Sequence, residues 1–305
     1  MSMSRFEGVL APVITPFDAS LLPDLPAYLD HCRWLSEQGA GLAVFGTNSE
    51  AASLSLAEKL NLLEQLLQAG IDPGLLMPGT GTTALPDTVE LTAAATRVGC
   101  RGVLMLPPYY FKNVSDDGLF AYFSEVINRV ADDRLQIYLY HIPQITQVPL
   151  SLALLEKLAA AYPNHIAGIK DSSGDPEFLR QLNGLELTDF RVFCGSESLL
   201  LENLRQGGAG CISATANINP AAIRALCQHW QDADADSRQQ QLNGLRKLFQ
   251  RLPMIPALKT AVGRYRSNPG WERLRPPLLG LTSEQRQELF AGLLDLDFRI
   301  PVDVT

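Results

Sequence analysis

The chain has few of the residues that bind metals or form disulfides. Its 305 residues include four histidines, none of them in an HExxH pattern, and no paired-carboxylate metal motif. Its five cysteines are Cys32, Cys100, Cys194, Cys211 and Cys227. Because they are odd in number, scattered and without a CxxC pair, we expect reduced thiols in a cytoplasmic protein rather than a disulfide framework or a zinc site. No motif requires a metal or another cofactor.

Long apolar runs and basic blocks are also missing. No stretch approaches the roughly 18 apolar residues that a membrane-spanning helix needs, and the polar residues 1–5 do not resemble a signal peptide. The net charge is −8 and the isoelectric point is about 5.1, which disfavours nucleic acid and anionic membranes as partners. With 46% hydrophobic and 19% charged residues, the composition is that of a globular protein with a large core.

Short apolar runs alternate with longer amphipathic segments along most of the chain. The runs typical of buried parallel strands lie at 9–15, 41–45, 75–79, 102–106, 136–140, 166–170, 191–195 and 210–213. Segments with helical spacing lie at 25–38, 55–69, 115–131, 151–161, 176–185 and 197–206. Ser55 with Glu58 predicts a capping box, and Ser151 predicts a helix N-cap.

Eight strand–helix units in succession predict a (β/α)8 barrel, the TIM-barrel fold. The competing fold, a doubly wound open sheet, is disfavoured because no GxGxxG follows the first strand. The glycine-containing run at 79–83 lacks the lysine of a phosphate-binding loop, so we interpret it as a turn before a helix. We expect the barrel to span residues 1–219. Residues 220–305, with helical patterns interrupted by prolines, are expected to form a C-terminal helical extension packed on the barrel.

Lys170 is the residue most suited to covalent chemistry. It ends the apolar run Ile166-Ala-Gly-Ile-Lys170 and is followed by polar turn residues. It would therefore lie at the carboxyl end of a barrel strand, where the active sites of this architecture are found. Burial there disfavours the charged ammonium and favours a neutral amine that can attack a carbonyl. On this segment alone, a lysine that extends outward from a strand end remains the alternative.

The other strand ends carry hydroxyls and glycine-containing turns. They are Gly46-Thr-Asn-Ser-Glu50, Pro107-Pro-Tyr-Tyr-Phe-Lys112, Tyr138-Leu-Tyr-His-Ile-Pro143, Gly195-Ser-Glu197 and Ile212-Ser-Ala-Thr215. This set has no His–Ser pair and no carboxylate dyad, which disfavours triad hydrolysis and two-carboxylate glycoside hydrolysis. A single lysine nucleophile among tyrosine and threonine hydroxyls favours imine chemistry on a carbonyl substrate.

These motifs together resemble those of the dihydrodipicolinate synthase and N-acetylneuraminate lyase superfamily, the class I pyruvate-type aldolases. The matching elements, in the family's order and spacing, are Gly46-Thr-Asn-Ser-Glu50, Pro108-Tyr-Tyr110, Tyr140-His-Ile-Pro143, Gly168-Ile-Lys-Asp171 and Gly210-Cys-Ile-Ser213. Each motif alone is a weak signal, but five of them in order make the resemblance specific.

The resemblance implies roles for the matching catalytic residues. Lys170 would form a Schiff base with a 2-oxo acid, either pyruvate or a longer sugar-derived acid, and Tyr140 would transfer the protons. Thr47 would connect Tyr140, through a relay of hydroxyls, to Tyr110. Because Tyr110 reaches into the site of a neighbouring subunit in that family, the resemblance also implies a homo-oligomer, a dimer of dimers.

Other residues would bind the substrate. Backbone amides near Thr47 and Asn48, at the start of a helix, would hold its carboxylate, since helix amino termini bind anions through free N–H groups. The Ile212 carbonyl would lie beside the Schiff-base lysine. The candidates for the distal end of the substrate are Gly195, Ser196, Glu197 and Ser213. A turn and a helix cap would explain these last residues equally well.

Several of these residues also fit ordinary structural roles. Thr47 would then simply cap the following helix, and Glu50 would act only on the helix dipole. Tyr109 and Tyr110 would be aromatic anchors in a subunit interface.

The strand around Tyr140 raises a similar question of orientation. We expect one of Tyr138 and Tyr140 to face the outside of the barrel as a packing residue. Alternation along the strand also turns His141 away from the face that Tyr140 uses, which favours a supporting role for this histidine.

The chain departs from the synthase branch at three places. Asn48 and Ser49 replace its second threonine and its glycine, so the carboxylate pocket differs in detail. Ile145 stands where that branch has an arginine that clamps a second carboxylate, and isoleucine cannot replace a bidentate cation. Gln147 replaces a glycine. The apolar residue at 145 is more similar to the 2-keto-3-deoxy-sugar-acid aldolases and dehydratases, whose substrates carry distal hydroxyls.

We therefore expect a cofactor-free class I lyase that forms a Lys170 imine with a small 2-oxo acid. The expected reaction is retro-aldol cleavage of a 2-oxo sugar acid to pyruvate and an aldehyde, or its reverse, through an enamine. Dehydration and a dihydrodipicolinate synthase-like condensation on the same imine are the close alternatives. An alternative from a different class is a barrel that binds a small oxo acid without turning it over.

Overall fold

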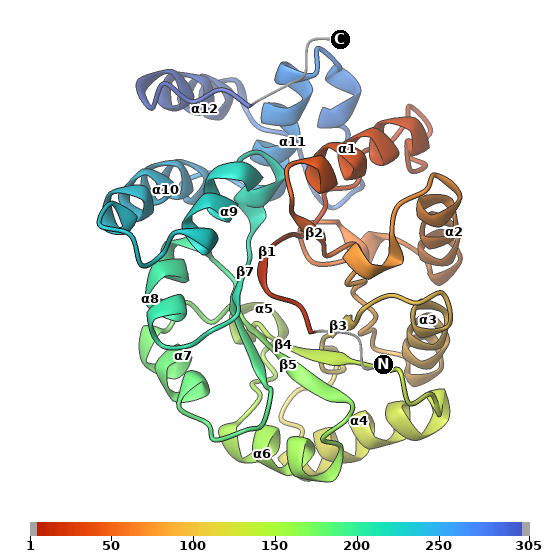
Figure 1. Cartoon of the computed structure of the whole chain (residues 1–305). Helices are drawn as coiled ribbons and strands as arrows, with labels where there is room; N and C mark the ends of the chain where they lie inside the picture. Colours follow the sequence, from red (N-terminus) through yellow and green to blue (C-terminus); the bar gives the residue numbers. More distant parts are fainter. Residues whose placement is uncertain (1–4, 301–305) are drawn as a thin grey trace.

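Seven parallel strands form the centre of the protein in the computed structural model, which describes residues 5–300. They are β1 (Gly8–Ala11), β2 (Gly41–Leu42), β3 (Val103–Met105), β4 (Ile137–His141), β5 (Ile166–Asp171), β6 (Arg191–Cys194) and β7 (Gly210–Ile212). Their order in the sheet is β2-β1-β7-β6-β5-β4-β3. The sheet curls, and its strands lie inside a ring of helices (Figure 1). The predicted α/β fold with parallel strands is therefore confirmed.

The segment at 75–79, predicted as the third strand, is not a regular strand. Leu76 bridges to β2 and Gly79 bridges to β3, both in parallel, but each bridge is isolated. The segment begins within a short 3-10 helix (Pro73–Leu75). Pro78 also lacks the backbone N–H that would continue a hydrogen-bonded ladder. The prediction of a strand here is wrong, although the segment does lie between β2 and β3.

Helices cover the outside of the sheet and continue beyond it. They are α1 (Leu25–Glu37), α2 (Leu56–Gln68), α3 (Leu85–Arg97), α4 (Asp116–Val130), α5 (Pro143–Thr146), α6 (Leu152–Ala161), α7 (Pro176–Asn183), α8 (Leu200–Arg205), α9 (Pro220–Gln228), α10 (Ala235–Gln250), α11 (Met254–Tyr265) and α12 (Ser283–Asp295). The predicted capping box of Ser55 and Glu58 is present at α2, and Ser151 caps α6. Within residues 5–300, no helix has the length and apolar character needed to span a membrane.

The helical ranges given by the sequence pattern include neither α3 nor α11, although the run at 79–83 is interpreted as a turn before a helix, and each omission has a physical reason. On α3 the buried side includes Thr88, Thr92 and Thr96, so the helix lacks a continuous apolar stripe. For α11 the prolines suggest a break in the chain. Pro253 instead forms the N-cap, and Pro256 lies in the first turn of the helix. Proline loses no hydrogen bond in the first turn of a helix, because the N–H donors of that turn have no partner within the helix.

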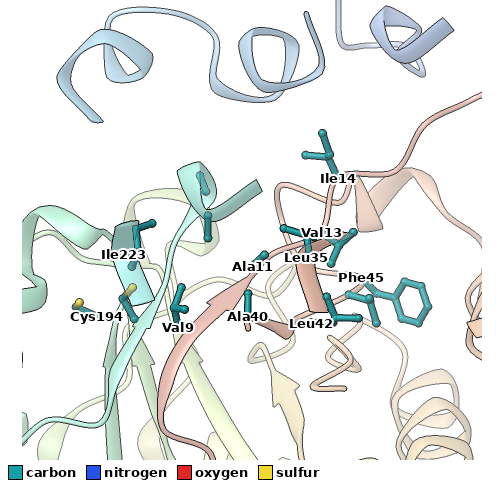
Figure 2. Close-up of a cluster of buried hydrophobic side chains, with 14 of the residues drawn as sticks. Val9, Ala11, Val13, Ile14, Leu35, Ala40, Leu42, Phe45, Cys194 and Ile223 are labelled. Carbon is teal, nitrogen blue, oxygen red and sulfur yellow. The ribbon is translucent and has the colours of Figure 1, made fainter. Parts of the chain in front are cut away.

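Buried apolar side chains form two clusters. The larger one fills the space between the strands and the helices, and Figure 2 shows the part around β1 and β2. The smaller one is enclosed by the strands and includes Leu10, Met77 and Phe193. Tyr138 and Tyr140 both belong to this inner cluster. The expectation that one of them faces outward is therefore wrong, because residues two apart on a strand share the same face.

The helices after β7 reach back to the carboxyl ends of the strands. α10 contacts the 3-10 helices η3 (Glu197–Leu199) and η4 (Ala214–Asn217), which follow β6 and β7, and α11 also contacts η4. Figure 1 shows α10, α11 and α12 together on one side of the molecule. The chain beyond the last strand therefore contributes residues to the end of the sheet where sites are expected.

Candidate active site

Lys170 and Tyr140 lie side by side near the carboxyl ends of β5 and β4. The two residues are partners in the parallel register, and the Lys170 Nζ atom lies 4.1 Å from the centre of the Tyr140 ring. Each residue is only 3% exposed. The lysine therefore does not extend into solvent from the end of its strand, as the structural alternative would require.

The Tyr140 hydroxyl has polar partners that stabilise its ionised form. It lies 3.3 Å from the Thr47 Oγ1 atom, and Lys170 and Ser172 lie close enough to favour its ionised form. Burial opposes ionisation of the phenol, but the positive charge of Lys170 and these polar partners outweigh it and lower the pKa of Tyr140 below its usual value. A phenol with a lowered pKa loses its proton more readily, which suits it to proton transfer.

Thr47 and Asn48 lie in a tight turn that follows β2. The Ser49 amide donates to the Gly46 carbonyl over 3.1 Å, and the Gly46 amide donates to the Ser49 hydroxyl over 3.1 Å. Among the described residues, the amides of Thr47 and Asn48 have no hydrogen-bond partner. The turn leads into a short 3-10 helix (Ala51–Ser53), so it does not open a long helix as expected. Two adjacent free amides still form a concavity that suits an anion.

Glu50 fixes this turn to α11. Its carboxylate forms an ion pair with the Lys259 Nζ atom over 2.6 Å, and both side chains are 0% exposed. The Arg275 amide donates to the second carboxylate oxygen over 3.3 Å. Glu50 also has a φ of 56°, in the left-handed region that side chains with a Cβ rarely adopt. Glu50 is therefore a structural anchor for the turn, which differs from the expected action on a helix dipole alone.

A cleft of about 380 Å³ lies next to Lys170. The predicted site residues that line it are Thr47, Asn48, Tyr140, Lys170, Gly195 and Ser196. A Cβ atom on Gly195 would lie 2.0 Å from the Ser172 hydroxyl, so a larger residue would displace the partner of Tyr140. A second, more apolar cavity of about 300 Å³ shares Thr47 and Tyr140 but does not include Lys170. The first cleft is therefore the candidate site.

Three predicted residues do not reach this cleft. Ile212 is 0% exposed and belongs to the inner cluster, and Ser213 is also 0% exposed. Tyr110 is 77% exposed and lines neither cavity, whereas its neighbour Tyr109 lines the second one. One chain alone therefore does not connect Tyr110 to Thr47. A relay that uses Tyr110 from another subunit stays a prediction.

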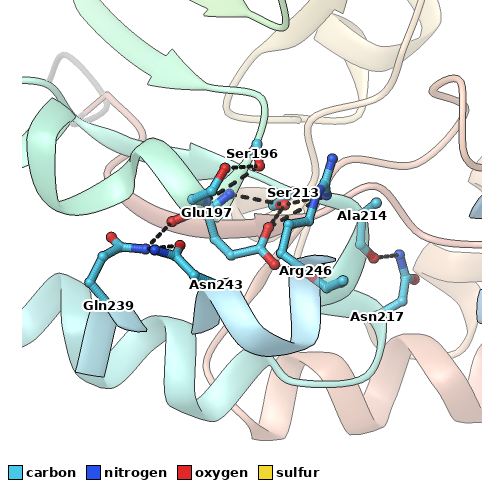
Figure 3. Close-up of polar contacts among 10 residues, drawn as sticks. Ser196, Glu197, Ser213, Ala214, Asn217, Gln239, Asn243 and Arg246 are labelled. Carbon is cyan, nitrogen blue, oxygen red and sulfur yellow. Dashed lines mark hydrogen bonds and ion pairs between the residues drawn. The ribbon is translucent and has the colours of Figure 1, made fainter. Parts of the chain in front are cut away.

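Ser213 belongs to a buried polar network around Glu197, which Figure 3 shows. The Glu197 carboxylate accepts hydrogen bonds from the hydroxyls of Ser213 and Thr215. Arg246 of α10 donates to the Ser213 hydroxyl over 3.2 Å and lies 3.5 Å from the Glu197 carboxylate. In this chain protein groups already contact the polar atoms of Ser213 and Glu197, and a contact of these two residues with the substrate stays a prediction.

Arg246 is the cleft residue that sequence reasoning missed. It lines the same cleft as Lys170, yet it lies on a helix after the last strand and belongs to none of the strand-end motifs. A search restricted to strand ends therefore could not find it. Only the packing of α10 against η3 and η4 brings it to the site.

His141 points to the opposite side of β4 from Tyr140, as alternation predicts. Its Nδ1 atom accepts a hydrogen bond from the Leu150 amide over 3.1 Å, and its ring lies 4.7 Å from the ring of Phe178 on α7. Burial lowers the pKa of His141 to about 4. The imidazole is therefore neutral at pH 7 and holds the strand in place from outside the cleft.

The site as a whole combines a buried amine, an ionisable phenol and free backbone amides. An amine and a proton-transferring phenol are the groups that addition to a carbonyl requires. Within residues 5–300, no group of three or more histidine, cysteine, aspartate or glutamate side chains is arranged to hold a metal ion.

Comparison with known proteins agrees with this arrangement. Residues 5–295 match the model of the dihydrodipicolinate synthetase family. An uncharacterized DapA-like lyase of Chloroflexus aurantiacus is 34% identical over 95% of this chain and 97% of its own length. Dihydrodipicolinate synthase from Agrobacterium tumefaciens has a TM-score of 0.88 at 33% identity, covering 96% of this chain and 99% of its own.

A second solved structure is YagE from E. coli K12, a prophage protein of the dihydrodipicolinic acid synthase family in complex with pyruvate. It has a TM-score of 0.87 at 29% identity, covering 96% of this chain and 99% of its own. The family match, residues 5–295, thus includes the helices after the last strand. The chain belongs to the dihydrodipicolinate synthetase family.

Proposed function

We propose that this protein is a Schiff-base-forming lyase that acts on a 2-oxo acid, with Lys170 as the nucleophile. The observation that carries the proposal is the buried Lys170 amine, 4.1 Å from the centre of the Tyr140 ring, beside a cleft of about 380 Å³. A protein that only binds its ligand has no need for a buried amine next to an ionisable phenol. The pyruvate complex of YagE supports pyruvate as the ligand that this cleft holds.

The first step joins Lys170 to the substrate. The Lys170 Nζ atom gives a proton to Tyr140 and attacks C2 of the 2-oxo acid as the free amine, which forms a carbinolamine. The former carbonyl oxygen then leaves as water, with one proton from the amine and one from Tyr140, so a protonated imine and an ionised Tyr140 remain. The Thr47 hydroxyl, 3.3 Å from that of Tyr140, orients the phenol for these transfers.

The second step breaks a carbon–carbon bond. The imine withdraws electrons, so the C3–C4 bonding pair moves onto C3 and an enamine forms. At the same time the C4 hydroxyl gives its proton to the ionised Tyr140, and C4 leaves as an aldehyde. Protonation of C3 and hydrolysis of the imine then release pyruvate and restore the amine. The lowered pKa of Tyr140 supports this role, because it makes the phenolate available at less alkaline pH.

The free amides of Thr47 and Asn48 are proposed to hold the substrate carboxylate. Both residues line the same cleft as Lys170, and two adjacent free amides suit an anion. This places the carboxylate on one side of the reacting C2 atom and leaves the other side of the cleft for the distal end of the substrate. The Ile212 carbonyl is proposed to face the imine, as the family resemblance implies.

The apolar residue at 145 supports a sugar-acid aldolase over a synthase. Ile145 is 59% exposed and lines the cleft, and it cannot make the bidentate contact of the arginine expected there in the synthase branch. Retro-aldol cleavage of a 2-keto-3-deoxy sugar acid is therefore the proposed reaction. Dehydration uses the same imine and is the second candidate.

A closed barrel is proposed from the backbone hydrogen bonds of the segment at 75–79. The Met77 amide donates to the Leu42 carbonyl over 2.9 Å and the Leu104 amide donates to the Pro78 carbonyl over 2.8 Å, which supports closure of a (β/α)8 barrel through this segment. The helices of residues 220–305 would be its C-terminal extension.

The exposed loop after β3 supports an oligomer. Tyr110 is 77% exposed and Phe111 is 55% exposed, and their rings pack edge to face at 5.9 Å. Large exposed aromatic side chains of this kind are typical of interfaces. We propose a dimer of dimers in which this loop contacts a second subunit, with sedimentation velocity as its test.

The proposed reaction is tested by a screen of 2-oxo acids with pyruvate release as the readout. Lys170→Met is compared with Lys59→Met, which removes another largely buried lysine from α2. We expect the wild-type protein and Lys59→Met to release pyruvate from 2-keto-3-deoxy sugar acids, and Lys170→Met to be inactive. Normal turnover by a folded Lys170→Met variant would reject the covalent route. Saturable binding of pyruvate without any turnover would instead support the non-catalytic alternative.

A further inference from the structure

Arg246 brings a positive charge to the Lys170 cleft from outside the strand-end motifs. It lies on α10 and lines the cleft together with Gln250 of the same helix. Its side chain is only 12% exposed, so its guanidinium is held against the cleft wall rather than in bulk water. A buried cation normally finds hydrogen-bond acceptors for its donors.

Arg246 has fewer such acceptors than it has donors. Its Nη1 atom donates to the Ser213 hydroxyl over 3.2 Å and to the Glu197 carboxylate over 3.5 Å, at the limit of a useful contact. The buried Nε atom has no hydrogen-bond partner among residues 5–300. A guanidinium has five N–H donors in a planar fork. Because Nε is closed off from solvent, the donors that remain for a ligand are the unused ones of Nη1 and Nη2.

Glu197 holds the guanidinium in place but leaves it incompletely satisfied. The Glu197 carboxylate already accepts hydrogen bonds from the hydroxyls of Ser213 and Thr215, and its backbone carbonyl accepts from the Gln239 side chain over 2.8 Å. This network fixes Glu197 at 1% exposure. Arg246 is therefore positioned by a rigid partner, as its contacts with Glu197 and Ser213 in Figure 3 show. Its remaining donors have no acceptor among residues 5–300.

The other charges of the cleft do not supply that acceptor. Asp171 also lines the cleft, but its carboxylate accepts from the Ser173 amide over 3.0 Å and from the Ser173 hydroxyl over 2.9 Å. Lys170 is the second cationic group, and it is committed to the reacting carbonyl in the proposed function. Arg246 is therefore the charged group of the cleft that the proposed chemistry does not use, and a cation there favours an anionic group at the distal end of the substrate.

We propose that Arg246 determines substrate specificity by binding a terminal carboxylate on the aldehyde half of the substrate. This inference rests on the proposed function and deepens it, because it names the chemical class of the substrate as a 2-oxo acid with a second, distal carboxylate. The first carboxylate binds the amides of Thr47 and Asn48, and the second binds the fork of Arg246. A planar guanidinium matches a carboxylate with two parallel hydrogen bonds. Because Arg246 would bind the second carboxylate, the residue at 145, elsewhere on the cleft wall, would not have to carry a positive charge.

Two aldehydes that differ only in the group at issue test this inference. Glyceraldehyde and tartronate semialdehyde both carry a hydroxyl beside the aldehyde, but one ends in a hydroxymethyl group and the other in a carboxylate. The measurement is kcat/KM for condensation of each with pyruvate. We expect the wild-type protein to prefer tartronate semialdehyde. Arg246→Met should lower kcat/KM for tartronate semialdehyde by about 10- to 100-fold, because it removes a hydrogen-bonded charged contact. It should change kcat/KM for glyceraldehyde by less than about threefold.

Lys247→Met is the matched control. It removes a positive charge from the next residue of α10, which is exposed and does not line the cleft. We expect it to keep the wild-type preference. If Arg246→Met does not fold, as judged by circular dichroism, Arg246→Lys carries the test: it keeps the charge but loses the fork, and KM for tartronate semialdehyde should rise while kcat changes little.

The outcomes separate this inference from the proposed function. If the wild-type protein forms no pyruvate adduct that borohydride can reduce, the proposed function fails. If the adduct forms but the wild-type protein shows no preference for tartronate semialdehyde, only the proposed role of Arg246 is overturned. The same holds if Arg246→Met lowers kcat/KM for both aldehydes equally.

Discussion

Replacement of Tyr140 by phenylalanine isolates the contribution of one hydroxyl. The ring that packs against Lys170 at 4.1 Å remains, and so does the packing of the inner cluster. Only the hydroxyl is lost, with its 3.3 Å contact to Thr47 and its electrostatic interactions with Lys170 and Ser172. The variant should therefore lose proton transfer while it keeps its fold and its amine.

The size of the effect follows from the chemistry of that hydroxyl. Positioned general acid–base groups contribute about 10²- to 10⁴-fold in rate, which corresponds to roughly 2.7–5.4 kcal/mol of transition-state stabilisation. We expect kcat for pyruvate release to fall by that factor in Tyr140→Phe, measured by a coupled spectrophotometric assay. A folded Tyr140→Phe variant with kcat within about threefold of wild type would refute the assignment of proton transfer to this residue.

Tyr138→Phe is the control for this prediction. Tyr138 lies two residues earlier on the same strand and in the same inner cluster, and its hydroxyl accepts from the Phe6 amide over 2.9 Å. Its loss should lower the free energy of unfolding by about 1 kcal/mol, the usual worth of one hydrogen bond. We expect kcat to stay unchanged, because this hydroxyl does not contact Lys170 or Thr47.

Three further variants test the support of the site. Lys259→Met leaves the Glu50 carboxylate buried without its 2.6 Å partner and should lower the free energy of unfolding by about 3–5 kcal/mol, and adding Glu50→Gln should restore part of that loss. Urea denaturation measures both variants, and a Lys259→Met midpoint equal to that of the wild type would contradict the anchor role. Gly195→Ala places a Cβ 2.0 Å from the Ser172 hydroxyl, so kcat should fall while the protein stays folded, and a wild-type kcat would show that the contact does not matter. His141 has a pKa of about 4 against an ordinary value of 6.5, so the unfolded chain binds its proton first and stability declines as pH falls from about 6.5 toward 4. In His141→Gln this decline should become shallower, and identical pH dependence of urea midpoints in the two proteins would contradict it.

The strand-end pattern predicts the centre of the site because parallel strands all end at the same side of a sheet. Lys170 and Tyr140 end neighbouring strands, so their register alone brings them together. The turn with Thr47 and Asn48 follows β2 and reaches the same cleft. For these residues the local sequence determines the position, and the structure places them where the pattern predicts.

The site residues that the sequence did not predict are those whose position depends on tertiary packing. Arg246 reaches the cleft only because α10 folds back onto 3-10 helices that follow β6 and β7. Ser213 follows a strand as predicted, but the neighbouring Glu197 and Arg246 occupy its hydroxyl. No local pattern in the sequence states which polar groups are satisfied by distant partners. The wrong expectation that one of Tyr138 and Tyr140 faces outward has a simpler cause, since residues two apart on a strand share a face.

The third predicted strand shows a limit of a different kind. Its apolar residues occupy the space of a strand between β2 and β3, yet only Leu76 and Gly79 make bridges. Hydrophobic runs report burial, whereas a regular ladder also needs a donor at each backbone position, and Pro78 has none. Burial of the segment was therefore predictable, and its hydrogen bonding was not.

The most direct test of the central claim is to locate the covalent adduct. The protein is incubated with pyruvate, reduced with borohydride, digested and mapped by mass spectrometry. We predict one modified peptide, with the added mass on Lys170, and no adduct on the largely buried Lys59 or on Lys259. A protein that remains unmodified under these conditions, or that carries its adduct on a lysine other than Lys170, would contradict the account.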